Sequence, residues 1–230
     1  MKNARNLTRR TLITAATVVC LSLPTVAEAD VNLGIAAAIG TTGYGGHVSI
    51  PVVETLNARL GFNYFSYNFS GNPDVVDYKF KLKLNTVDAL ADWHPFNGSF
   101  RLTGGLVWNG NKIDAKAKAS GGEYEFDGNK YNGDLAGDVK GRIEFRDVAP
   151  YLGLGWGSAP RSRGLYFSSD YGVIFQGKPS VTLKNRNCQL PGDGCSRLAN
   201  DLAEEEKELE DYTKDFRYYP VIRFSLGFRF

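Results

Sequence analysis

The chain is expected to be all-β and to form a closed, antiparallel, up-and-down β-barrel that crosses a membrane. Its last thirteen residues, 218–230, alternate between an apolar face and a face that carries Arg223 and Arg229. Similar alternating segments recur along the chain, and after the N-terminal leader no stretch is apolar for eighteen residues. Helical spans are therefore excluded, which leaves strands with lipid on one side and a polar lumen on the other.

The first 29 residues have the three parts of a secretory signal peptide. Four basic residues precede a mostly apolar run at 11–23, and small residues follow at the positions that a signal peptidase reads. Cleavage between Ala29 and Asp30 would leave one barrel domain, residues 30–230. A membrane anchor is disfavoured, because about thirteen apolar residues fall short of the roughly twenty that a spanning helix needs. The general secretory route is expected over the twin-arginine route, because a lipid-facing barrel cannot fold before it meets a membrane.

The mature chain is almost neutral. The full sequence has 27 Lys plus Arg and 25 Asp plus Glu, and the leader holds four of the bases and one acid, which leaves 23 against 24. Proteins that bind nucleic acid concentrate an excess of base. Nucleic acid is therefore not an expected partner.

Eight segments alternate as barrel strands should, and an even number suits a single-chain bacterial barrel. The alternation changes phase near Gly110 and again near Asp147, and a bulge at Gly110 would explain the first change. Ten strands are the alternative, if residues 110–138 contribute a further membrane-crossing hairpin. The eight segments are 31–39, 44–50, 58–64, 78–85, 100–108, 139–156, 165–176 and 218–230.

The inward face of these segments is rich in charge. A barrel of about eight strands is roughly filled by its side chains, so a wide pore is disfavoured and a plugged lumen is expected. Asp88, Asp92 and Asp147 could balance part of an excess of base, because unpaired charges in a narrow lumen are costly. The predicted lumen charges are Arg59, Lys79, Lys81, Lys83, Arg101, Arg142, Glu144, Asp170, Arg223 and Arg229, together with Lys140 and Arg146.

The last long connection, 177–217, has its own internal structure. Cys188 and Cys195 are the only cysteines after the leader, and an exported pair across a short turn predicts a disulfide. Ser196 could cap a short helix that runs to about Phe216, with one apolar stripe and an acidic remainder. A solvated face is preferred over a cation site for the acidic run. The stripe comprises Leu198, Leu202, Leu209 and Tyr212, and the acids are Glu204, Glu205, Glu206, Glu208 and Glu210.

With the leader, the eight segments and the terminal phenylalanine in place, the chain resembles the small outer-membrane barrels of the OmpA, OmpX and OmpW type. The segments PVVETLNARLG at 51–61 and RFSLGFRF at 223–230 carry the resemblance most closely. It implies the outer membrane of a Gram-negative bacterium, contact with membrane lipid and lipopolysaccharide, and a monomer. It also implies that Phe224, Leu226, Phe228 and Phe230 form the signal read by the barrel-assembly machinery.

Three functions compete. The first is a structural, surface-interaction or envelope-integrity role through the external loops of a plugged barrel. The second is a narrow channel, or an OmpW-like passage for small apolar molecules through the wall. The third is hydrolysis of lipid A, because His47 and Ser49 have the spacing of PagL-type deacylases and Glu54 follows. His47 and Ser49 are expected to face the lumen at the periplasmic rim, so the first function is preferred and no catalytic residue is predicted.

No cofactor or metal ion is expected. The glycine-rich stretch GTTGYGG at 40–46 lacks the lysine and the helix of a phosphate-binding loop. Two thiolates without a nearby histidine are too few ligands for a zinc site.

Overall fold

The structure is a computed structural model that describes residues 32–71, 76–119, 122–157 and 163–230. The expected signal peptide, with its cleavage site at Ala29 and Asp30, lies outside these residues. Within them, no helix has both the length and the apolar character needed to cross a membrane.

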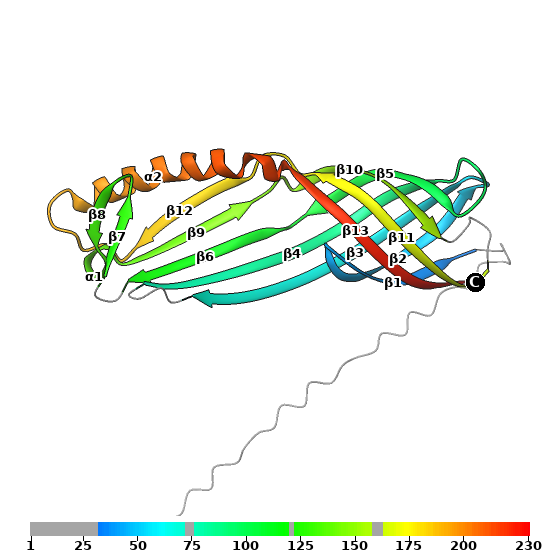
Figure 1. Cartoon of the computed structure of the whole chain (residues 1–230), viewed down its shortest axis with the longest axis horizontal. Coiled ribbons are helices and arrows are strands. Elements are labelled where there is room, and N and C mark those ends of the chain that lie inside the picture. Colours follow the sequence, from blue (N-terminus) through cyan, green and yellow to red (C-terminus); the bar gives the residue numbers. More distant parts are fainter. Residues whose placement is uncertain (1–31, 72–75, 120–121, 158–162) are drawn as a thin grey trace, which may run out of the picture. The chain divides into compact units, whose positions relative to one another are not determined.

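The predicted eight-stranded antiparallel barrel is confirmed. Its wall runs in the order β1, β2, β3, β4, β5, β10, β11, β13, and β13 pairs with β1 to close the ring (Figure 1). The bounds are β1 Gly34–Gly40, β2 Gly43–Val53, β3 Leu56–Gly71, β4 Val76–Trp93, β5 Phe100–Asn109, β10 Val148–Gly157, β11 Gly164–Phe175 and β13 Tyr218–Arg229.

The wall is apolar outside and polar inside, as the last strand shows. In β13, Phe224, Leu226 and Phe228 are 41%, 62% and 44% exposed, whereas Arg223 and Arg229 are 5% and 2% exposed. The same alternation holds along β1, β2 and β11. Because successive strand residues point to opposite faces, closing the sheet sends one set to the lipid side and the other into the lumen.

The second and third strands lie closer together along the chain than the segments 44–50 and 58–64 predict. β2 continues to Val53 and β3 begins at Leu56, with only Glu54 and Thr55 between them. Most of the connection between the segments 139–156 and 165–176 lies outside the described residues.

Three further strands extend the sheet beyond the barrel. They are β6 Lys112–Ala119, β9 Asp138–Glu144 and β12 Ser180–Arg186, and they follow in order from the first half of β4. We call this part, with the paired ends of β3 and β4, the external sheet. Figure 1 shows β5 leading into β6 and β9 leading into β10.

The predicted bulge at Gly110 is wrong. β4 pairs Thr86 with Asn109 and Lys83 with Lys112, so no extra residue is inserted between the two pairings. The side chain of Asn111 instead bridges the interruption, because its Oδ1 accepts the backbone N–H of Asn85 at 2.9 Å. The alternation of the backbone therefore continues unchanged from β5 into β6. The apparent change of phase in the sequence arises because each face of the sheet meets different surroundings in the barrel and in the external sheet.

The alternative of ten strands is excluded for the described residues. β7 Glu123–Phe126 and β8 Asn129–Asn132 form their own two-stranded sheet, which does not join the wall. A one-turn helix, α1 Gly133–Ala136, follows and leads into β9. Residues 110–138 therefore supply β6 and an external hairpin rather than a membrane-crossing pair.

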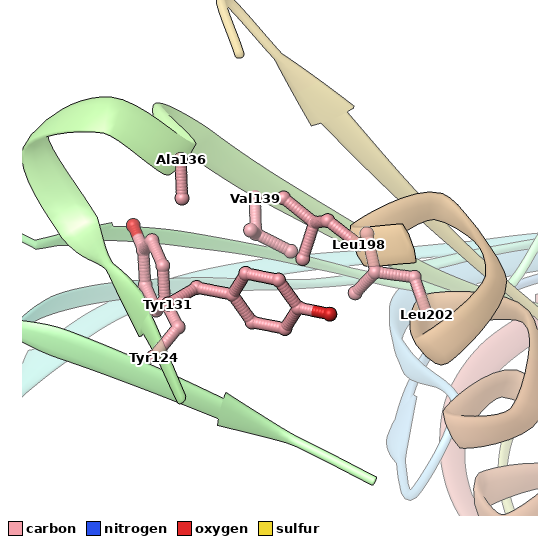
Figure 2. Close-up of a cluster of buried hydrophobic side chains, with 6 residues drawn as sticks. All are labelled: Tyr124, Tyr131, Ala136, Val139, Leu198 and Leu202. Carbon is pink, nitrogen blue, oxygen red and sulfur yellow. The ribbon is translucent and has the colours of Figure 1, made fainter. Parts of the chain in front are cut away.

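The predicted helix is present as α2 Gly194–Thr213, followed by the 3₁₀ turn η1 Lys214–Arg217. It begins before Ser196, which lies inside it, and Asp193 occupies the capping position. Leu198 and Leu202 are buried, but Tyr212 is 82% exposed, so the apolar stripe is shorter than expected. Figure 2 shows the two leucines packed with Val139 of β9 and with Tyr124 and Tyr131 of the hairpin.

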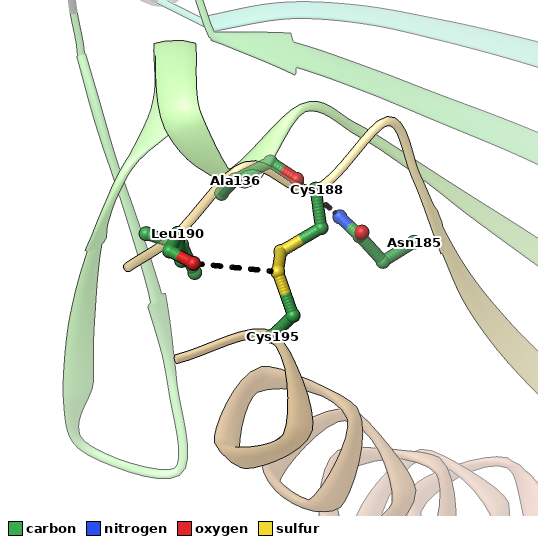
Figure 3. Close-up of a disulfide and its surroundings, with 5 residues drawn as sticks. All are labelled: Ala136, Asn185, Cys188, Leu190 and Cys195. Carbon is green, nitrogen blue, oxygen red and sulfur yellow. Dashed lines mark hydrogen bonds between the residues drawn. A yellow bond between two sulfur atoms is a disulfide. The ribbon is translucent and has the colours of Figure 1, made fainter. Parts of the chain in front are cut away.

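The predicted disulfide between Cys188 and Cys195 is confirmed. Its Cα atoms lie 6.0 Å apart, within the usual range. Figure 3 shows the bridge joining the segment after β12 to the first turn of α2. The helix is thereby fixed at one end to the strand that it covers.

Candidate functional site

The lumen is crossed by a network of buried ion pairs. Arg59 on β3 donates to Asp170 on β11 at 2.9 Å and to Asp92 on β4 at 3.0 Å. Arg101 on β5 reaches the same two carboxylates, at 2.7 Å for Asp170 and 3.7 Å for Asp92. Each of these side chains is at most 6% exposed.

The pairs bridge opposite sides of the ring. β3 and β11 are four strands apart in either direction, so the bond between Arg59 and Asp170 spans the full bore. The bond of 3.2 Å from Arg223 on β13 to Asp88 on β4 does the same. Asn63 and Thr103 complete the network by donating to Asp88 and Asp92. Separating one of these pairs would leave both of its charges buried without a partner, which is costly. The bonds therefore keep the lumen closed.

An apolar cluster also fills the lumen. It is built by inward-facing side chains of five neighbouring strands, β4, β5, β10, β11 and β13. Its presence agrees with the expectation that eight strands enclose only enough space for side chains. In the sequence, this cluster is visible as apolar residues at strand positions whose neighbours on the same face are polar. The cluster comprises Leu90, Val107, Ala149, Tyr151, Ile174 and Val221.

A small polar space of about 20 Å³ remains beside the network, enough for about one water molecule. His47 and Ser49 of β2 border it, as does His94, which follows β4. His94 is fully buried, although the preceding residue, Trp93, is half exposed on the outside of the barrel. Arg229 donates to the Ser49 hydroxyl at 3.2 Å, so a cation contacts the oxygen that a deacylase would use as its nucleophile.

The structure divides the predicted lumen charges into two groups. Five lie inside the barrel: Arg59, Arg101, Asp170, Arg223 and Arg229. The prediction is wrong for Lys79, Lys81, Lys83, Arg142 and Glu144, and for Lys140 and Arg146. In the external sheet, Leu82 and Leu84 continue the lumen face of β4, and the three lysines at 79, 81 and 83 continue its outer face. Asp88 and Asp92, which were expected to balance part of the excess of base, are acids that the lumen arginines bind.

The last strand of the external sheet, β12, has no neighbouring strand on its outer edge, and the acidic helix α2 covers that edge. Glu206 and Glu210 of α2 accept hydrogen bonds from the backbone N–H groups of Leu183 and Val181 in β12. Two carboxylates thus take the place of a neighbouring strand and block an edge that could pair with another chain. The expectation of a simply solvated acidic face holds for the rest of the run and fails for these two residues.

The hairpin and the helix are joined by a buried phenol. The Tyr131 hydroxyl donates to the Asp201 carboxylate of α2, and Asn129 donates to the same carboxylate at 2.9 Å. Burial, together with the bond to Asp201, raises the pKa of Tyr131 to about 12. The phenol is therefore held neutral in the folded protein.

No family model matches the sequence, and no curated protein matches it. Among solved structures, Acinetobacter baumannii CarO2 is similar with a TM-score of 0.55 and 21% identity, over 87% of this chain and 99% of that one. Acinetobacter baumannii CarO gives 0.54 and 21%, over 87% and 98%. Yersinia pestis Ail, solved with the heparin analogue sucrose octasulfate, gives only 0.33 and 13%, over 87% and 96%. By its fold, the chain is a small eight-stranded antiparallel β-barrel that resembles Acinetobacter baumannii CarO.

Proposed function

We propose that this protein is a non-conducting barrel of the Gram-negative outer membrane that acts at the cell surface through its external sheet. The observation that carries the proposal is the ion-pair network across the bore, in which Arg59 and Asp170 join opposite walls. A solute would have to break several buried, charge-assisted bonds to pass. The external sheet, by contrast, presents five neighbouring strands to solvent.

We further propose that the C-terminal strand directs assembly of the barrel and that lipid surrounds the finished monomer. Phe224, Leu226, Phe228 and Phe230 would be read by the barrel-assembly machinery, since they form an unbroken outward apolar row at the end of β13. Membrane lipid and lipopolysaccharide would surround a monomer, because the closed wall leaves no unpaired strand edge within the barrel.

Planar-bilayer conductance tests the non-conducting state. The wild-type protein should give no steady current, whereas the double variant Arg59→Ala with Asp170→Ala should give a measurable one, because it removes the bond across the bore. The double variant Arg142→Ala with Asp114→Ala is the control, since it removes an ion pair outside the barrel. A stable wild-type channel would refute the proposal and favour a narrow pore.

A lipid A hydrolase is disfavoured by the position of its residues. His47 and Ser49 are 7% and 5% exposed and lie within the lumen, where an acyl chain has no space. We expect His47→Ala to leave the acylation pattern of lipid A unchanged in mass spectra of whole cells. If lipid A lacks one acyl chain in wild-type cells and retains it in cells with His47→Ala, the hypothesis of a lipid A hydrolase would be favoured again.

A further inference from the structure

The outer face of the external sheet is hollowed. The hollow has a volume of about 870 Å³ and is lined by side chains from five strands, β3, β4, β6, β9 and β12. Seven of the lining residues are basic and two are acidic. The opposite face of the sheet packs against the hairpin and α2. The hollow is therefore a charged surface that nothing else in the described chain covers.

Four lysines form a row across the hollow. Lys79 is directly opposite Lys116, Lys116 is opposite Lys140, and Lys140 is opposite Lys184. Directly opposed like charges destabilise a sheet. With neighbouring strands about 4.8 Å apart, the row extends over roughly 14 Å. Such a row costs stability by itself, and an anion bound along it would offset that cost.

The acids of the hollow do not neutralise this row. Asp114 and Glu144 both pair with Arg142, at 2.7 and 3.6 Å. For the described residues, the structure records no ion pair that involves the four row lysines, or Lys81 and Arg186 beside them. The hollow thus keeps a clear excess of positive charge that is directed outward.

The position of the hollow suggests which anion it meets. The outer face of β4 passes from the exposed, lipid-side Val87 to Lys83 in four residues, or about 13 Å along the strand. At the tilt of a barrel strand this is roughly 10 Å along the membrane normal. Head groups add only about 5–8 Å to each side of the hydrocarbon core. Lys83 therefore lies at the outer edge of the head-group layer, and the hollow, which begins at Lys81 on the same strand, faces that edge from its outer side.

We propose that the hollow binds phosphate groups carried on the saccharide head group of a lipid in the outer leaflet. Lysine binds phosphate as a point charge, and basic pockets at membrane surfaces bind phosphorylated head groups. Several phosphates on one saccharide would satisfy a row of four lysines better than a single ion. The inference rests on the outer-membrane placement in the proposed function, but not on whether the barrel conducts.

Binding of lipopolysaccharide to the purified mature barrel in detergent micelles tests the proposal. The variant in which Lys79, Lys116, Lys140 and Lys184 are all replaced by Gln should bind roughly 600-fold more weakly, since each of the four surface lysines contributes about a fivefold effect. Its thermal stability without lipid should be equal to or above that of the wild type, because the replaced charges repel one another. Retained affinity would overturn the proposal.

A matched variant controls for net charge. Gln at Lys130, Lys178, Lys207 and Lys214 removes the same charge outside the hollow and should leave affinity within about twofold of wild type. An equal loss in both variants would show that net charge alone attracts the lipid, and would overturn the site.

Two further ligands separate the sources of phosphate. Lipopolysaccharide stripped of its phosphates should lose binding, whereas inositol hexakisphosphate, a soluble phosphate cluster, should bind to the wild type and compete with the lipid. Equal binding of the dephosphorylated lipid would refute a phosphate site. Tight binding of inositol hexakisphosphate without any binding of the lipid would assign the hollow to a soluble ligand and refute the membrane source. Conductance would be unchanged by the lysine variant, so failure here does not bear on the plugged lumen.

Discussion

The barrel and the external sheet share the long strands β3 and β4 but have opposite polarity. In the barrel, the outer face is apolar and the inner face holds Arg59, Arg101 and Asp170. In the external sheet, the outer face is basic and the inner face carries apolar side chains that pack on α2. The backbone keeps its register against β4 from β5 into β6. The reversal of polarity therefore comes from the choice of side chains and not from a shift of the strand. Lipid outside the wall and water outside the sheet explain the difference.

The largest expected effect on stability comes from replacing a buried carboxylate in the lumen, compared with replacing an exposed carboxylate in the external sheet. Asp170→Asn should destabilise the barrel by roughly 3–5 kcal/mol, because it leaves Arg59 and Arg101 buried with less countercharge. Asp114→Asn, whose partner Arg142 is half exposed, should cost less than about 1 kcal/mol. Urea unfolding in detergent, read by heat-dependent gel mobility, measures both. Equal losses in the two variants would contradict the buried network.

The core beneath α2 gives the next effect. Leu198 is fully buried, so Leu198→Ala should destabilise the packing of the helix on the sheet by roughly 2–5 kcal/mol. Tyr212→Ala, at an exposed site of the same helix, should change it by less than about 0.5 kcal/mol. Hydrogen exchange should then increase in α2 and β12 while β1 and β13 remain protected. Faster exchange in the barrel strands would show that the two regions unfold together.

A smaller effect is expected at the covered edge. Replacing Glu206 and Glu210 with Ala should release two β12 amides, at roughly 0.5–1.5 kcal/mol each. The amides of Val181 and Leu183 should exchange faster, and the open edge should favour self-association in light scattering. Ala at Glu204 and Glu208 provides the control, because neither bonds to the strand edge. Unchanged exchange at Val181 and Leu183 would refute the edge-covering role.

The smallest effect concerns pH. The pKa of Tyr131 is raised to about 12 in the folded protein from an ordinary value of 10.0, so the neutral phenol is favoured by folding. Its contribution should be complete below pH 10 and disappear as the pH rises from about 10 to 12. The difference in phenolate absorbance between the wild type and Tyr131→Phe should correspond to one tyrosine that titrates late. A difference that titrates near the ordinary value of 10 would contradict the buried bond to Asp201.

The sequence predicted the barrel strands well where the chain meets lipid. Phe224, Leu226 and Phe228 alternate with inward residues because one face must be apolar and the other cannot be. The same reasoning failed for Lys79, Lys81 and Lys83, because it assigned the apolar face of every strand to the lipid side. Above the membrane, the apolar face turns toward α2, and a rule based on lipid no longer applies. Asp88 and Asp92 could be predicted only as possible counter-charges, since it is the pairing of β4 that places their side chains in the lumen.

By itself, the sequence determined the strand-forming segments, the even number of barrel strands, the disulfide and the presence of a helix after it. These features depend on local alternation, on parity and on the compartment, all of which can be read along one chain. Only the tertiary structure decided that Arg59 reaches Asp170 across the bore, that Glu206 covers an edge strand, and that four lysines align across four strands. Such contacts depend on register between strands far apart in sequence, and register is fixed when the sheet closes.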